Sequence, residues 1–124
     1  MLLHIDVSWL LDIQEQAVPE DISVADYSAL VAAVARHKTR IPRPATADPK
    51  PSWHAAALLH TLVLLQPLPY RNSLFACQAT AAYMHASGEG IDASYGAMVE
   101  LVRDIRAGKA DVYRAEDRIR SWRI

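Results

Sequence analysis

The residues best placed to do chemistry lie at positions 66–74, in the stretch LLHTLVLLQPLPYRNSLFA (58–76). Two apolar runs meet there, and Pro67 and Pro69 fix the backbone between them. A helix that begins near Asn72 would leave the backbone amide groups of its first turn unpaired, and such an end binds anions. The candidate anion- or nucleotide-binding residues are Gln66, Tyr70, Arg71, Asn72 and Ser73.

The same corner also fits a purely structural role, in which Asn72 caps the next helix and Arg71 is solvated. Other titratable groups give weaker signals. His54 and His60 are six residues apart, so they do not share a helix face as a ligand pair. The single cysteine, Cys77, lies in an apolar run, which predicts a buried and unreactive thiol. One cysteine also excludes a cysteine-based zinc site, and we expect no metal site.

The spacing of apolar residues predicts the helices that must hold this corner. Ser8 would cap a first helix that Pro19 ends. Ser23 would start a second helix, with Asp26 completing a weak capping box. The expected buried face of this second helix consists of Tyr27, Leu30, Val31, Val34 and Ala35.

The remaining helices are predicted at 53–66, 72–86, about 93–107 and 112–122. The first of these is apolar on nearly all sides, which indicates a central helix. Gly88 and Gly108 would end two of the helices, Asp92 or Ser94 would cap the fifth, and Asp111 would begin the last. The chain is therefore expected to be an all-α, single-domain bundle of about six helices over residues 1–124.

Three short segments complete this picture. Residues 41–52 (IPRPATADPKPS) hold four of the seven prolines, which predicts a stiff proline-rich loop or flap. Residues 2–6 are compatible with a short strand, and 90–92 with a brief extended piece.

Composition limits the functions that the chain can have. Its net charge is −1, from 13 Lys and Arg against 14 Asp and Glu, so nothing indicates direct nucleic-acid binding. Seven of the basic residues fall within 103–124 among acidic ones, which predicts a solvated face with salt bridges. There is no signal-peptide pattern and no apolar run long enough to span a membrane, so we expect a cytoplasmic protein. The three tryptophans, which could lie in the core or at an interface, are Trp9, Trp53 and Trp122.

The order of these elements resembles the Fic/Doc fold: a buried central helix, a motif loop, a second buried helix ending in glycine, and paired terminal helices. The stretch AALLHTLVLLQPLPYRNSLFACQATAAYMHASGEGID is similar to the Fic core, and IRAGKADVYRAEDRIRSW to the tail of Doc-type toxins. The resemblance is best over residues 50–124. It extends to small actinobacterial Fic-type toxin components of toxin–antitoxin pairs.

The Fic motif is His-Pro-Phe-x-Asp/Glu-Gly-Asn-x-Arg, and 66–74 is a degenerate version of it. Pro67 and Asn72 match, Leu68 replaces the phenylalanine that anchors the loop, and Ser73 fills a variable position. The resemblance implies that Gln66 replaces the catalytic histidine, Tyr70 the acidic metal ligand, Arg71 the glycine, and Leu74 the phosphate-binding arginine.

These substitutions argue against the usual AMP transfer and against Doc-type phosphoryl transfer. Gln66 cannot act as a general base, Tyr70 is a poor ligand for magnesium, and Leu74 offers no charge to a phosphate. Three hypotheses remain: a toxin-like component of a toxin–antitoxin pair that acts by binding, an enzyme with altered nucleotide- or phosphate-dependent chemistry, and a non-catalytic interaction module. The partner implied by the first is a cognate antitoxin protein. No cofactor is assigned, although nucleotide or phosphate would suit the corner.

Overall fold

The computed structural model describes residues 5–18, 23–39 and 50–124, and this part of the chain folds into six helices. Their bounds are α1 Val7–Ala17, α2 Tyr27–His37, α3 Pro51–Leu65, α4 Asn72–Ala86, α5 Tyr95–Arg106 and α6 Val112–Ser121. The predicted all-α fold is confirmed. No helix among the described residues is both long and apolar enough to cross a membrane.

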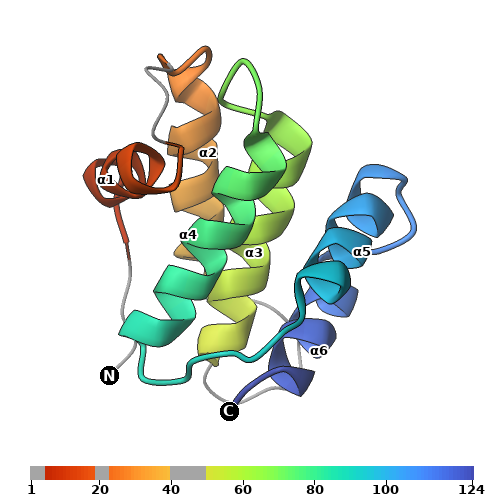
Figure 1. Ribbon diagram of the computed structural model, residues 1–124. Coiled ribbons are helices and arrows are strands. Elements are labelled where there is room, and N and C mark those ends of the chain that lie inside the picture. The colour runs from red at the N-terminus through yellow and green to blue at the C-terminus, as the bar shows by residue number, and fades with distance from the viewer. Residues whose placement is uncertain (1–4, 19–22, 40–49) are drawn as a thin grey trace.

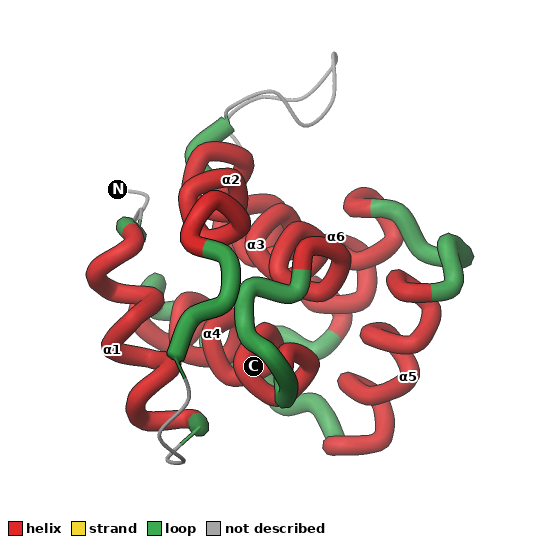
Figure 2. Tube along the Cα trace, turned by 90° about the horizontal axis from the view of Figure 1, so that it is seen from above, coloured by secondary structure: helices red, strands yellow, loops and turns green. Residues whose placement is uncertain are grey.

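Helix α3 is the central element, as its uniformly apolar sequence predicts. Twelve of its fifteen residues are buried, and the helix packs against α2, α4, α5 and α6. Figure 2 shows α3 in the middle of the bundle, and Figure 1 shows α1 and α2 on one side of the α3–α4 pair with α5 and α6 on the other. Alanines at 55–57 and at Ala76 and Ala79 have almost no exposed surface, so the helices approach closely.

The predicted buried face of α2 is wrong in part. Leu30 and Val34 are buried, but Tyr27 is 58% exposed and Val31 is 59% exposed. The helix instead turns its small residues, Ala29 and Ala33, toward the core. Small side chains allow α2 to lie close to α3, and this packing outweighs the burial of two larger side chains.

Two predicted N-caps are also wrong. The side chain of Asp6, and not that of Ser8, accepts a hydrogen bond from the Trp9 amide, at 2.8 Å, and α1 therefore begins at Val7. Asp26, and not Ser23, caps α2 by accepting from the amides of Ser28 and Ala29. In both cases an acidic residue occupies the last extended position, where its charge also suits the positive end of the helix.

The proline-rich segment ends inside a helix. Pro51 is the first residue of α3 and Ser52 the second, so the helix starts two residues before the predicted Trp53. Proline suits this position because its missing N–H would have had no partner there. Residues 41–49 of the predicted loop lie outside the described residues, as do Pro19 and positions 2–4 of the predicted strand.

The C-terminal half follows the sequence more closely. Ser94 caps α5 through the Ala97 amide, and Asp111 caps α6 through the Arg114 amide. Gly88 and Gly108 follow the ends of α4 and α5 with φ of 81° and 76°, the left-handed conformation that glycine favours. Ile91 forms a single antiparallel bridge with Arg123, so the predicted extended piece holds the C-terminal residues against the bundle.

A pair of buried histidines joins α2 to α3. Nδ1 of His37 donates to the backbone carbonyl of His54 at 3.0 Å, and Nδ1 of His54 donates in turn to the carbonyl of His37. Nε2 of His37 accepts from the Ile5 amide at 3.2 Å, so each ring nitrogen of His37 has a partner. Neither histidine has exposed surface, so the two side chains have a structural role between α2 and α3.

Candidate functional site

The corner between α3 and α4 contains two non-glycine residues in the left-handed conformation. Helix α3 ends at Leu65, and Gln66 follows with φ 49° and donates its amide to the Leu62 carbonyl. Arg71 has φ 62° and directly precedes α4. This conformation is unfavourable for residues with a Cβ, so packing on both sides of the corner must hold it.

Asn72 holds the corner together from inside α4. Its Oδ1 accepts from the Leu68 amide and its Nδ2 donates to the Leu68 carbonyl, both at 2.8 Å. Leu68 itself is 3% exposed and packs into the core, so this one side chain satisfies both backbone groups of a buried residue. The predicted capping role of Asn72 is therefore wrong: Arg71 occupies the cap position, and Asn72 is the first helical residue.

A second set of hydrogen bonds fixes the corner to α2. The carbonyl of Pro67 accepts from the amides of Ala25 and Asp26, at 2.8 and 3.1 Å. Because Asp26 also caps α2, the start of α2 and the corner share one polar network. The loop is therefore anchored at Pro67 and at Leu68, while the side chains of Gln66, Tyr70 and Arg71 stay exposed.

All five predicted site residues line one cavity of about 240 Å³ at the start of α4. The structure thus brings together Gln66, Tyr70, Arg71, Asn72 and Ser73. Sequence reasoning missed Arg106, which reaches the same cavity from the last turn of α5. Val63 and Pro69 complete the lining, and none of the described residues in it is acidic.

The electrostatics of this corner cavity favour an anion. The cap residue Arg71 makes no side-chain hydrogen bond to the first turn of α4, so the positive end of the helix faces the cavity. The guanidinium groups of Arg71 and Arg106 add positive charge to the same wall. The arrangement can therefore bind a phosphate or carboxylate group.

The described lining of the corner cavity contains no carboxylate and no histidine. Gln66 does not titrate, and His60 is not among the lining residues. His60 instead lies 3.0 Å from Arg36, measured from Nδ1 to Nη1, and burial together with the Arg36 charge lowers its pKa. His60 therefore lies outside the described lining of the corner cavity.

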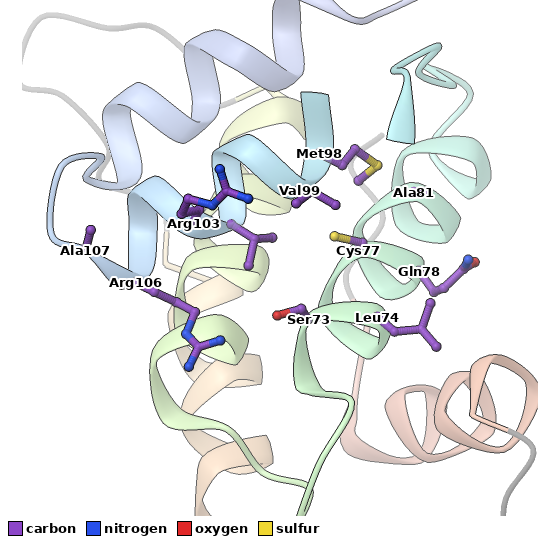
Figure 3. Close-up of a pocket in the computed structure, with 11 residues that line it drawn as sticks. Ser73, Leu74, Cys77, Gln78, Ala81, Met98, Val99, Arg103, Arg106 and Ala107 are labelled. Carbon is purple, nitrogen blue, oxygen red and sulfur yellow. The ribbon is translucent and has the colours of Figure 1, made fainter. Parts of the chain in front are cut away.

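A larger cavity of about 610 Å³ lies between α4 and α5 and shares Ser73 and Arg106 with the corner cavity. Figure 3 shows Ser73 and Cys77 of α4 on the side that faces α5. Leu74 lines this groove and is not part of the corner cavity. Cys77 is half-buried, and burial raises the pKa of its thiol to about 11, which fits the expected unreactive cysteine.

The arginines of the C-terminal region fall into two groups, those in ion pairs and those that line the groove. Ion pairs join Arg118 to Glu100 at 3.6 Å, Arg123 to Glu89 at 2.9 Å, and Arg120 to Asp117. These pairs agree with the predicted solvated face. Arg103 and Arg106, by contrast, have no ion-pair partner among the described residues and line the groove.

Of the tryptophans, Trp53 is a core residue. It is 4% exposed, its indole N–H donates to the Thr39 carbonyl, and its ring lies against Tyr113. Trp9 and Trp122 are partly buried and pack on the core.

Within residues 5–18, 23–39 and 50–124 there is no cluster of three or more His, Cys, Asp or Glu side chains that could hold a metal ion. The sequence matches no protein-family model and none of the curated proteins with which it was compared.

Proposed function

We propose that this chain is a toxin-like component of a toxin–antitoxin pair, built on a degenerate Fic/Doc-like fold and acting in the cytoplasm by binding. One observation carries the proposal. Six of the nine residues of the degenerate motif, Gln66, Pro69, Tyr70, Arg71, Asn72 and Ser73, line one cavity that also holds the guanidinium of Arg106, and no carboxylate or histidine lies among the described residues of its lining. The site therefore has the composition of a binding site for an anionic group and lacks the groups for nucleotidyl transfer.

The backbone of the corner supports the resemblance to the Fic motif. Arg71 stands at the motif's glycine position, and its φ of 62° lies in the region that glycine favours. Leu68 stands at the phenylalanine position and is buried as an anchor. Asn72, which matches the motif asparagine, holds Leu68 through two hydrogen bonds.

The side chains support the loss of the usual chemistry. Gln66 and Tyr70, at the base and metal-ligand positions, line the cavity without supplying a titratable base or a carboxylate. Leu74, at the arginine position, faces the groove between α4 and α5. Arg106 partly compensates for this loss, since it brings a guanidinium group to the corner from another helix.

Exposed apolar residues beside the corner suit a protein partner. Leu64 is 47% exposed, Leu65 45% and Tyr70 53%, all within seven residues of the chain. Large apolar side chains exposed close together are typical of protein-binding surfaces. We propose that a cognate antitoxin covers these residues and the mouth of the corner cavity.

The test is growth of a bacterial host in which this chain is expressed alone, or together with the protein encoded next to it. We expect growth arrest with the chain alone and recovery with its neighbour. Tyr70→Ala and Arg106→Ala should weaken the arrest, whereas Tyr27→Ala and Arg114→Ala, on exposed residues outside both cavities, should not. Equal growth of all cultures would contradict the toxin proposal and favour a non-catalytic interaction module.

A second candidate is an enzyme with altered nucleotide- or phosphate-dependent chemistry. Arg71 and Arg106 both line the cavity at the start of α4, and two guanidinium groups there favour the enzyme candidate. The corner cavity of 240 Å³ lies below the range of about 300–1,000 Å³ for sites that enclose a drug-sized ligand, so it would hold a phosphate group alone.

Thermal unfolding in millimolar ATP, GTP, CTP or inorganic phosphate, with magnesium, tests this candidate. A ligand that binds only the folded chain raises the melting temperature. The rise should be lost in Arg106→Ala and kept in Arg114→Ala. No rise with any of the four would exclude the enzyme candidate.

A further inference from the structure

The groove between α4 and α5 is the cavity of about 610 Å³ described above, and it is larger than the corner cavity. Its α4 wall is formed by Ser73, Leu74, Cys77, Gln78 and Ala81. These positions recur at three and four residues, so they share one face of the helix. The volume of about 610 Å³ is in the range of sites that enclose a small organic ligand.

The groove stays open because α5 packs on other helices. The buried residues of α5, Leu101, Val102 and Ile105, belong to the core, and α5 makes its larger contact with α3. On α4, the groove is faced by small side chains at Cys77 and Ala81. Small side chains at these positions leave space between the two helices.

The two ends of the groove differ in chemistry. Near Ala81, its α5 wall is formed by Met98 and Val99, which are apolar. Arg103 and Arg106 also line the groove from α5, and Figure 3 shows Arg106 on the side of the groove where Ser73 lies. Figure 3 shows this change along α5, with the thioether of Met98 at one end and the guanidinium of Arg106 at the other.

The charge at the arginine end is not compensated within the described chain. Arg103 and Arg106 are exposed and have no carboxylate partner there, and no described residue of the lining is acidic. An uncharged apolar ligand would leave this charge without a partner, and a cation would be repelled. An anionic group at the Ser73 end would gain charge-assisted hydrogen bonds.

We infer that the groove binds a small amphiphilic anion, with its apolar body between Cys77, Ala81 and Val99 and its carboxylate, sulfate or phosphate head at Arg103 and Arg106. An acyl carboxylate and an alkyl phosphate share this chemistry.

Calorimetric titration of the full chain with dodecanoate, dodecyl phosphate, dodecanol and dodecyltrimethylammonium, each below its micellar concentration, tests the inference. We expect the two anions to bind at least about tenfold more tightly than the alcohol and the cation, because they alone pair with the arginines. Binding of dodecyl phosphate alone would identify a phosphate head, and binding of dodecanoate alone a carboxylate head.

Four variants locate the site. Arg103→Ala and Arg106→Ala should each weaken anion binding about tenfold, whereas Arg114→Ala, an exposed arginine of α6, should leave it unchanged. Ala81→Phe should fill the apolar end and weaken binding of every alkyl ligand. Because the arginines are exposed, their replacement should leave the fold intact, which circular dichroism checks.

Cys77 provides an independent reporter, because it is the single cysteine and lines the groove. Dodecanoate should slow its reaction with a maleimide, and Arg106→Ala should reduce that protection. Equal affinity for the anions, the alcohol and the cation would overturn the inference. So would anion binding that is unchanged in both arginine variants, or absence of binding by every ligand.

Discussion

The side-chain amide of Asn72 bonds both backbone groups of Leu68, each at 2.8 Å, and so closes the corner between the two central helices. Leu68 is buried, which means that its amide and carbonyl would otherwise lie away from water without partners. The asparagine therefore holds the loop in shape, with one N–H and one carbonyl lone pair of its amide used on Leu68. The other polar side chains that line the cavity, those of Gln66, Tyr70, Arg71, Ser73 and Arg106, make neither of these bonds.

Replacement of Asn72 should consequently destabilise the fold. Asn72→Ala leaves two buried backbone groups unpaired and should lower the free energy of unfolding by about 1–3 kcal/mol. Asn72→Asp should also destabilise, because a carboxylate oxygen would face the Leu68 carbonyl in place of the amide N–H. Urea denaturation measures both, with Ser73→Ala as the neighbouring control. Full stability of Asn72→Ala would show that the two hydrogen bonds do not hold the corner.

A glycine at position 71 should give a more stable chain than an alanine at the same position. Arg71 adopts φ 62°, a conformation that costs a residue with a Cβ roughly 1–2 kcal/mol. Arg71→Gly should therefore be more stable than Arg71→Ala by about 1 kcal/mol, since both variants lose the same charge and only alanine keeps the strain. The comparison requires only the difference between two denaturation midpoints. Equal stability of the two variants would mean that the left-handed conformation is not populated at this position.

The fold could be predicted because its signals are local. The apolar sequence of 53–66 indicates a helix buried on all sides. Gly88 and Gly108 end helices because glycine readily adopts the left-handed conformation that follows many helices, and a glycine is visible in the sequence. The caps were harder, because Ser8 and Asp6 are equally acceptable at a helix start. Tertiary contacts decide between these two residues. The closeness of α2 to α3 likewise determines which side of α2 is buried, with Ala33 facing inward and Val31 outward.

The site was predictable where its residues are adjacent in sequence. The five predicted residues lie within eight consecutive positions at the corner between α3 and α4, so their meeting in one cavity follows from the local chain path. Arg106 comes from another helix, and nothing local distinguishes it from the solvated arginines of α6. One signal was present: Arg103 and Arg106 lie one turn apart on the same face of α5 as Val99 and Val102, and this pattern extends an apolar face into a charged one.

The paired histidines should be important for stability. His37→Phe keeps an aromatic ring but leaves the Ile5 amide and the His54 carbonyl without their partners. Both groups are buried, so we expect a loss of about 2–4 kcal/mol in the free energy of unfolding. The matched control is His85→Phe on the exposed end of α4, which should change stability by less than about 0.5 kcal/mol. Similar losses for both variants would remove the special role of His37.

The reactivity of Cys77 should depend steeply on pH. Burial raises the pKa of its thiol from 9.0 to about 11, so at pH 8 almost all of the folded chain carries the unreactive thiol. Alkylation by iodoacetamide should accelerate about tenfold per pH unit between pH 8 and 10, and the urea-unfolded chain should react about a hundredfold faster at pH 8.

The same shift gives a stability prediction with a definite sign. Above pH 9 the unfolded chain loses the thiol proton while the folded chain retains it, so this group stabilises the fold fully below pH 9 and loses its contribution as the pH rises toward 11. The difference in unfolding free energy between the native chain and Cys77→Ala should therefore shift against the native chain over this range. Tyrosines and lysines titrate in both proteins and cancel in that difference. A difference that does not change between pH 8 and 11 would mean that the thiol lies in a more polar environment than the groove provides.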